Sequence, residues 1–155
     1  MQDIDVANLS VADAARALRK GDYSALELTD AYLRRIEAHN PTINAYITVT
    51  AERARADARR ATEELAAGKV RGPLHGIPIA HKDLYETAGI RTTGGSKIHA
   101  DYVPTADCTV VRKLREAGTI LLGKLNTHEY AYGVGPTSLA LNFQSSFPVA
   151  GSKLY

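Results

Sequence analysis

Apolar residues recur at helical intervals near the start of the chain, and their spacing predicts a helix that begins after Ser10. Ser10 and Asp13 have the spacing of a capping box, in which a hydroxyl and a carboxylate satisfy free amide groups at a helix start. We expect Gly21 to end this helix. Val11, Ala14, Ala15 and Leu18 should fall on one face of this helix.

Two more helices are predicted downstream by the same kind of pattern. Ser24 and Glu27 repeat the capping spacing, and the helix that follows should end near Asn40, because Pro41 disfavours helical geometry in the residue before it. Small apolar residues form a narrow stripe over residues 51–67. This third helix should therefore pack on a surface rather than lie inside a core.

Three short apolar or β-branched segments predict strands, at residues 44–50, 77–80 and 119–122. A further helix is expected over residues 106–117, directly before the last of these strands. This order of helices and strands predicts an α/β fold. Residues 72–96 are rich in glycine, proline, serine and threonine, a composition typical of loops that carry function.

Composition excludes several classes of protein for this chain of 155 residues. Its net charge is only +2, and the main basic cluster, residues 53–60, is interleaved with acidic side chains, so we expect no direct binding of nucleic acid. The first residues are acidic where a secretory signal would be basic, and no apolar run approaches the roughly 18 residues that span a bilayer. These features predict a soluble cytoplasmic protein that makes no membrane contact.

Lys82 is the first candidate for chemistry. It follows a short apolar run, and a lysine amine in apolar surroundings loses its proton more easily, which would let it accept a proton from a serine hydroxyl. The alternative is a lysine that leaves the edge of a sheet for solvent. Position alone favours this alternative.

Other motifs give little support for a metal or a cofactor, and we expect neither. His75 and His81 are six residues apart across turn-forming residues, which matches no strong metal-binding pattern. Residues 94–97 do not have the spacing of a phosphate loop, and residues 133–138 begin a dinucleotide motif without its third glycine. The single cysteine, Cys108, is best explained as a small apolar residue.

Several separated blocks, in order, resemble the amidase signature family. One is Gly-Pro-Leu-His-Gly-Ile-Pro-Ile-Ala-His-Lys-Asp-Leu at residues 72–84. The others are residues 88–90, 92–96, 106–129 and 132–133. The resemblance extends from the first helices to about Thr137 and aligns Lys82 with the family's catalytic lysine. It therefore favours Lys82 as a proton acceptor for a serine hydroxyl over Lys82 as a solvent-facing lysine.

The resemblance implies hydrolysis of small-molecule carboxylic amides to an acid and ammonia by a Ser–Ser–Lys triad. In that mechanism the lysine deprotonates a bridging serine, the bridging serine activates a nucleophilic serine, and backbone amides of a glycine-rich loop stabilise the oxyanion. The family fold resembles a large mixed sheet between helices. For this chain we therefore expect amino-terminal helices followed by part of an α/β/α core that is incomplete.

The resemblance weakens after residue 137, which divides the chain into an amidase-like part, residues 1–137, and a divergent tail, residues 138–155. Ser152 follows a glycine at about the right distance to be the bridging serine, but the second serine loop has no counterpart. We therefore expect a fragment that is inactive alone and that could associate through open sheet edges. A fragment of the A subunit of a tRNA-dependent amidotransferase and a non-catalytic interaction module are the alternatives.

Overall fold

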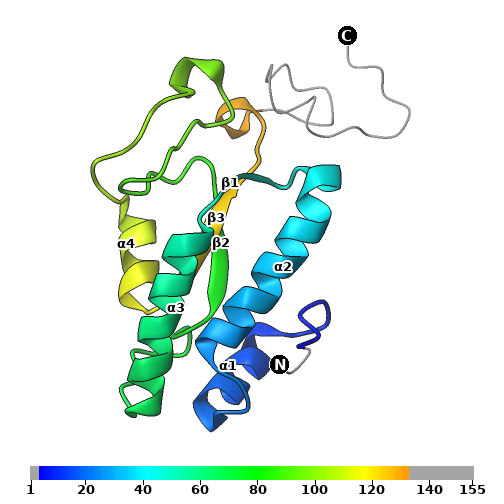
Figure 1. Cartoon of the computed structure of the whole chain (residues 1–155). Helices are drawn as coiled ribbons and strands as arrows, with labels where there is room; N and C mark the ends of the chain where they lie inside the picture. The colour runs from blue at the N-terminus through cyan, green and yellow to red at the C-terminus, as the bar shows by residue number, and fades with distance from the viewer. Residues whose placement is uncertain (1–3, 133–155) are drawn as a thin grey trace. The chain divides into compact units, whose positions relative to one another are not determined.

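The computed structural model describes residues 4–132, and in that range helices and strands alternate in an α/β fold, as predicted (Figure 1). In chain order the elements are α1 (Val11–Lys20), α2 (Ala25–Ile43), β1 (Tyr46–Val49), α3 (Ala51–Ala66), β2 (Pro78–Lys82), α4 (Thr109–Glu116) and β3 (Ile120–Leu125). Two 3₁₀ turns, η1 (Lys97–His99) and η2 (Glu129–Ala131), complete the described elements. None of the helices in this range is long and apolar enough to cross a membrane.

The three strands form one mixed sheet in the order β1-β3-β2. β1 is antiparallel to β3, with Tyr46 opposite Leu125. β2 and β3 run in the same direction, because the Ile120 amide donates to the Ile77 carbonyl (3.0 Å) and the Asp83 amide donates to the Leu125 carbonyl (3.0 Å). Parallel strands need a crossover connection, and here the chain segment that contains α4 provides it.

The described residues divide into two compact units, and each is built from separate stretches of sequence. The first, the helical unit, contains residues 4–38, Thr50–Ala80 and Arg112–Leu122. The second, the loop unit, contains His39–Val49, His81–Val111 and residues 123–132. Each unit therefore needs segments that are far apart in the sequence.

In the helical unit Ala14, Ala15 and Leu18 of α1 are buried as the sequence pattern indicates, whereas Val11, which was placed on the same face, is exposed in the first turn. The Ser10 side chain accepts a hydrogen bond from the Asp13 amide (3.1 Å), and Gly21 ends α1 in the left-handed conformation with φ 78°. α2 and α3 run antiparallel, since the Leu26 amide near the start of α2 donates to Thr62 Oγ1 near the end of α3 (3.2 Å), whereas residues further along α2 contact the first half of α3. The buried positions of α3 are the small residues Ala54, Ala58 and Ala61, so its narrow stripe is confirmed.

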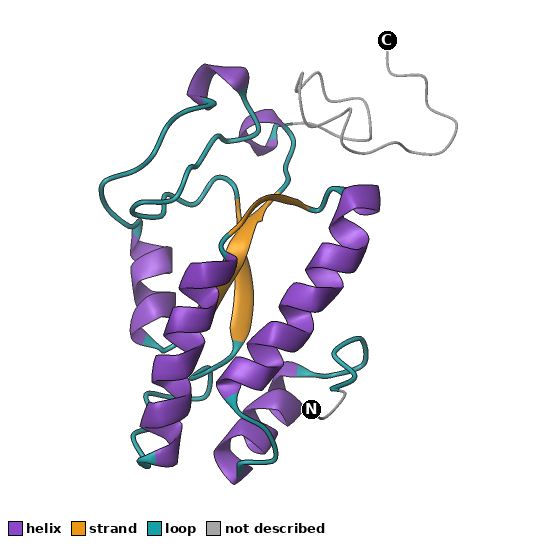
Figure 2. Ribbon diagram, in the orientation of Figure 1, coloured by secondary structure: helices purple, strands orange, loops and turns teal. Residues whose placement is uncertain are grey.

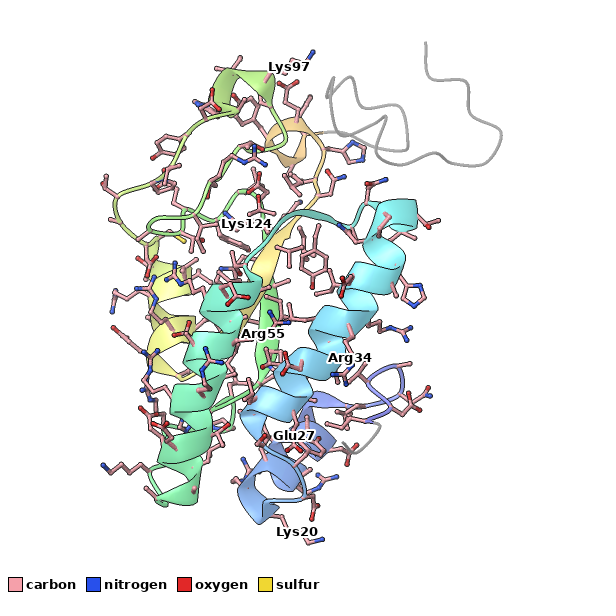
Figure 3. The ribbon with its side chains drawn as sticks, in the orientation of Figure 1. Lys20, Glu27, Arg34, Arg55, Lys97 and Lys124 are labelled. Atoms are coloured by element: carbon pink, nitrogen blue, oxygen red, sulfur yellow. The ribbon has the colours of Figure 1, made fainter. Side chains whose placement is uncertain are left out.

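A salt bridge also joins α2 and α3 in this unit. Arg55 Nε on α3 lies 2.8 Å from Asp30 Oδ1 on α2 (Figure 3). Both side chains are partly exposed, so solvent screens this pair and we assign it no large share of the stability.

The predicted end of α2 near Asn40 is wrong, because the helix continues to Ile43 with Pro41 inside its last turn. The Asn40 side chain supplies the physical reason. Its Oδ1 accepts from the Tyr46 amide (2.8 Å), and its Nδ2 donates to the Tyr46 carbonyl (3.1 Å). The Asn40 carbonyl also accepts from the Asn44 amide (2.7 Å). These bonds hold the last turn although proline provides no N–H.

α4 begins at Thr109, three residues later than predicted. The reason is that two preceding residues bond to a distant loop instead of starting the helix. The Asp107 carboxylate accepts from the Ala88 amide (2.8 Å), and the Cys108 amide donates to the Glu86 carbonyl (3.0 Å).

β3 extends to Leu125, beyond the predicted end at residue 122. The additional residues pair with β1, where Val49 lies opposite Gly123. A Cβ atom at Gly123 would collide with the Thr48 backbone oxygen, so this pairing requires glycine.

A long connection between β2 and α4 dominates the loop unit, and Figure 2 shows it mostly as loop with one short helical turn, η1. It contains residues 83–96 of the stretch 72–96 whose composition predicted a functional loop, whereas Pro78–Lys82 of that stretch form β2. Residues 92–96 of this stretch are all buried. Residues 92–96 therefore lie in the interior of the unit, and the candidate site is built on them.

Candidate functional site

Lys82 is the last residue of β2, and its side chain is exposed. The preceding residues, Pro78 to Ala80, are only partly buried. Within the described part of the chain, the apolar surroundings that the sequence suggested for this amine are therefore not found. An exposed primary amine at a strand end can donate hydrogen bonds when charged and can accept a proton when neutral.

The backbone on the carboxyl side of Lys82 is held at three points within the loop unit. The Asp83 amide donates to the Leu125 carbonyl (3.0 Å), and the Tyr85 amide donates to the Lys82 carbonyl (3.0 Å). The Asp83 carbonyl accepts from the Gly94 amide (2.8 Å). An exposed side chain thus projects from a strongly constrained turn.

Asp83 turns inward from that strand end and is fully buried. Its Oδ2 accepts two hydrogen bonds from Thr93, one from the amide (2.8 Å) and one from Oγ1 (2.6 Å). Thr93 Oγ1 in turn accepts from the Gly95 amide (3.1 Å). The carboxylate therefore organises the glycine-rich loop from inside.

The partner of Asp83 is Lys124, which sequence reasoning missed. Lys124 comes from β3 and is fully buried, with its Nζ 3.3 Å from Asp83 Oδ1 (Figure 3). The same Nζ donates to Thr92 Oγ1 (2.5 Å) and to the Tyr85 carbonyl (2.8 Å). Burial lowers the pKa of Lys124, and the Asp83 carboxylate opposes this change.

A signal for Lys124 was present in the sequence. It lies inside the apolar run of residues 120–125, where a lysine must either leave the strand or find a buried counter-charge. The predicted strand ended at residue 122 and did not include Lys124, and its counter-charge lies 41 positions earlier in the sequence, so spacing could not identify it.

The glycine pair Gly94-Gly95 forms a tight turn, with φ 62° and 70°. A Cβ atom at Gly95 would lie 2.7 Å from the Thr127 carbonyl oxygen, so the turn approaches the next segment closely. Beyond the turn, Ser96 Oγ donates to Glu129 Oε1 (2.5 Å). This stretch serves turn formation and packing in the structure.

His75 and His81, the histidine pair compared with metal-binding patterns, belong to different units. In the helical unit, His75 Nε2 lies 3.0 Å from Glu64 Oε2, and His75 Nδ1 accepts from the Arg71 amide (3.2 Å). Arg71 Nε also donates to Glu64 Oε2 (2.7 Å). Burial lowers the pKa of His75, and the Glu64 carboxylate partly offsets it. Residues 4–132 contain no group of three or more His, Cys, Asp or Glu side chains able to hold a metal ion.

Ser152, the candidate bridging serine, lies outside the described residues, as do the tail 138–155 and the motif at 133–138. Cys108, the single cysteine, is a free thiol that lies partly buried directly before α4. The structure therefore brings Lys82, Asp83, Lys124 and the loop 92–96 together, and it does not test the role of Ser152.

The sequence matches known proteins over most of its length. The family model described as Amidase matches residues 27–142. The A subunit of the glutamyl-tRNA(Gln) amidotransferase of Alkalilimnicola ehrlichii is 48% identical over 124 residues, which is 80% of this chain and 25% of the relative. The corresponding protein of Geobacter metallireducens is 46% identical over 137 residues, or 88% of this chain and 28% of the relative.

Solved structures also match most of this chain and about a quarter of their own length. The peptide amidase from Stenotrophomonas maltophilia is 36% identical with a TM-score of 0.76, over 81% of this chain and 26% of that one. An amidase family protein from Bacillus anthracis is 32% identical with a TM-score of 0.74, over 81% of this chain and 25% of that one. The chain thus spans about a quarter of the length of the relatives that it resembles.

Proposed function

Because the chain belongs to the amidase family, we propose that it forms the base-carrying part of an amide hydrolase and that Lys82 is the base. One observation carries this proposal. Lys82 presents an exposed amine from a turn whose backbone is held on its carboxyl side by three hydrogen bonds. A base needs such fixed geometry toward the group it deprotonates.

The proposed reaction follows a Ser–Ser–Lys scheme. Neutral Lys82 takes a proton from a bridging serine, which takes one from a nucleophilic serine, whose Oγ then attacks the amide carbonyl carbon. The tetrahedral intermediate collapses as its C–N bond breaks, and the leaving nitrogen receives the proton to give ammonia or an amine. Water then attacks the ester carbon and releases the acid. Ser152 is the candidate bridging serine in this chain.

The test is a pair of lysine variants in the complete open reading frame that carries this sequence. Lys82→Ala should lower kcat for benzamide or an amidated peptide by about 10²- to 10⁴-fold, the share expected of a general base. The control is Lys97→Ala, since Lys97 is also exposed in the loop unit but starts η1. Ammonia release measures the rate, and circular dichroism checks the fold.

Lys82→Ala activity within about tenfold of the parent would overturn the assignment of the base. An equal loss in the Lys97→Ala control would show that the effect is not specific to Lys82.

A second candidate, a fragment of the A subunit of a tRNA-dependent amidotransferase, is favoured by the higher identity to those proteins. Identity to the Alkalilimnicola ehrlichii protein is 48%, whereas identity to the peptide amidase is 36%. Glutamine would then be the amide substrate. Comparing ammonia release from glutamine and from amidated peptides, with and without the other amidotransferase subunits, separates the two candidates.

We also propose that the chain associates through its sheet edges, either with further protein sequence or with other copies. Within the described residues β1 and β2 are the outer strands of the sheet, and an outer strand can add a further strand through its backbone donors and acceptors. In a non-catalytic module this association would be the function itself. The chain would then fold and bind its partner without catalysing a reaction, so Lys82→Ala would change no reaction rate.

Cytoplasmic location stays a prediction.

A further inference from the structure

The buried pair Asp83–Lys124 is the feature of the loop unit that the proposed chemistry does not use. Both side chains have 0% exposure, and their charged atoms lie 3.3 Å apart. Burying two charges costs desolvation free energy, and a hydrophobic pair of similar volume would often be as stable. The arrangement therefore calls for an explanation beyond stability.

The bonds of Lys124 close a ring around the turn that follows Lys82. The Lys82 carbonyl accepts from the Tyr85 amide (3.0 Å), and the Tyr85 carbonyl accepts from Lys124 Nζ (2.8 Å). Lys124 Nζ also forms an ion pair with the carboxylate of Asp83, the residue directly after Lys82, and this pair closes the ring. The amine thus holds the turn at both its second and its fourth residue.

Asp83 fixes the same turn to a second segment. Its carboxylate accepts two bonds from Thr93, and its carbonyl accepts from the Gly94 amide (2.8 Å). Lys124 reaches the neighbouring Thr92 Oγ1 (2.5 Å). The two charges together therefore tie residues 82–85 to residues 92–94 through buried hydrogen bonds, which are stronger when one partner is charged.

We propose that Asp83, held by Lys124, is a positioning residue that fixes the direction in which Lys82 presents its amine. This inference rests on the proposed function of Lys82. A purely structural pair would change stability alone. A positioning pair must also change the rate of the chemical step, because a displacement of about 1 Å at a catalytic group can cost about 10²-fold in rate.

The test compares Asp83→Asn and Lys124→Met with Lys82→Ala in the complete open reading frame that carries this sequence. Asparagine keeps the volume of Asp83 and removes its charge, and methionine keeps an unbranched chain and removes the amine. We expect kcat for an amidated peptide to fall by about 10- to 100-fold in both variants, with KM changed by less than about threefold.

The matched control is His75→Gln, which disrupts a buried ionisable network in the other unit. It should lower stability and leave kcat within about twofold of the parent. Should Asp83→Asn or Lys124→Met fail to fold, Thr92→Val replaces them. It is nearly isosteric and removes the hydroxyl that accepts from Lys124 and donates to the Ile90 carbonyl (3.1 Å), while both charges of the pair remain. We expect it to lower kcat by about tenfold at unchanged KM.

Hydrogen exchange of the Gly94 amide gives an independent readout, since this amide bonds to the Asp83 carbonyl. Faster exchange together with the kcat loss would support positioning. Faster exchange with kcat unchanged would reduce the pair to a structural role and overturn the inference, while an inactive Lys82→Ala would leave the proposed function intact. Full activity of Lys82→Ala would overturn both.

Discussion

At the residue scale, His75 makes the stability of the chain depend on pH. Burial lowers its pKa below the ordinary value of 6.5, so the unfolded chain binds a proton that the folded chain resists. The stability contributed by neutral His75 is present above about pH 6.5 and is lost as the pH falls below it. One such group changes the free energy of unfolding by at most about 1.4 kcal/mol per pH unit.

We therefore expect the free energy of unfolding to fall between pH 7.5 and pH 5.5, and His75→Gln to flatten this dependence. Urea unfolding at several pH values measures it. The pKa of Glu64 is also lowered, by its hydrogen bonds to Arg71, but its contribution is lost only in a more acidic range, below about pH 4.5. An unchanged slope in His75→Gln would assign the pH dependence to other groups.

Lys82 and Lys124 show how far single residues could be predicted. Lys82 was found only through the ordered motifs around it, since its position at the end of a short apolar run favoured a surface lysine, and its side chain is in fact exposed. Lys124 received no prediction, because its burial depends on Asp83 in another part of the sequence. Charge pairing across the sheet is a tertiary property that a local pattern does not encode.

At the scale of elements, the glycine turn of residues 94–95 offers a matched pair of substitutions. Gly95 and Gly89 have nearly the same positive φ, 70° and 72°, but a Cβ atom would meet the Thr127 carbonyl only at Gly95. Gly89→Ala should cost about 1 kcal/mol for the left-handed backbone. Gly95→Ala should cost about 2 to 3 kcal/mol, since steric overlap is added to that strain.

Chemical denaturation of both variants measures this difference in the free energy of unfolding. Equal losses would mean that segments 92–96 and 126–130 can separate at little cost, which would contradict the close packing at Gly95.

Helices and strands were predicted well wherever local chemistry decides them. Ser10 and Gly21 limit α1 as expected, because a cap depends on neighbouring residues. The predicted boundaries failed at α2 and α4, where contacts distant in sequence decide. The Asn40 side chain holds the last turn of α2 through Tyr46, and Asp107 bonds to Ala88 instead of starting α4. Neither contact can be inferred from the effect of a proline on the residue before it or from the helical spacing of apolar residues.

At the scale of the whole molecule, we expect residues 1–155 alone to release no ammonia from benzamide. Sequence 138–155 offers Ser152 but no second serine loop like that of the family, so the proton path from Lys82 would have no nucleophile at its end. Long incubation of the purified chain with benzamide, with ammonia detected enzymatically, measures this. Turnover, or covalent labelling of Ser152 by a fluorophosphonate, would contradict the expectation.

The interleaving of the two units has a consequence for synthesis on the ribosome. The helical unit needs residues 112–122 to join residues 4–38, and the loop unit needs residues 123–132 to join residues 39–49. At about 5 to 20 residues per second, the first helices wait on the order of ten seconds for the strand that completes their unit. During that wait their apolar faces are open to chaperones, so slow codons before residue 120 should lower the soluble yield more than slow codons after it.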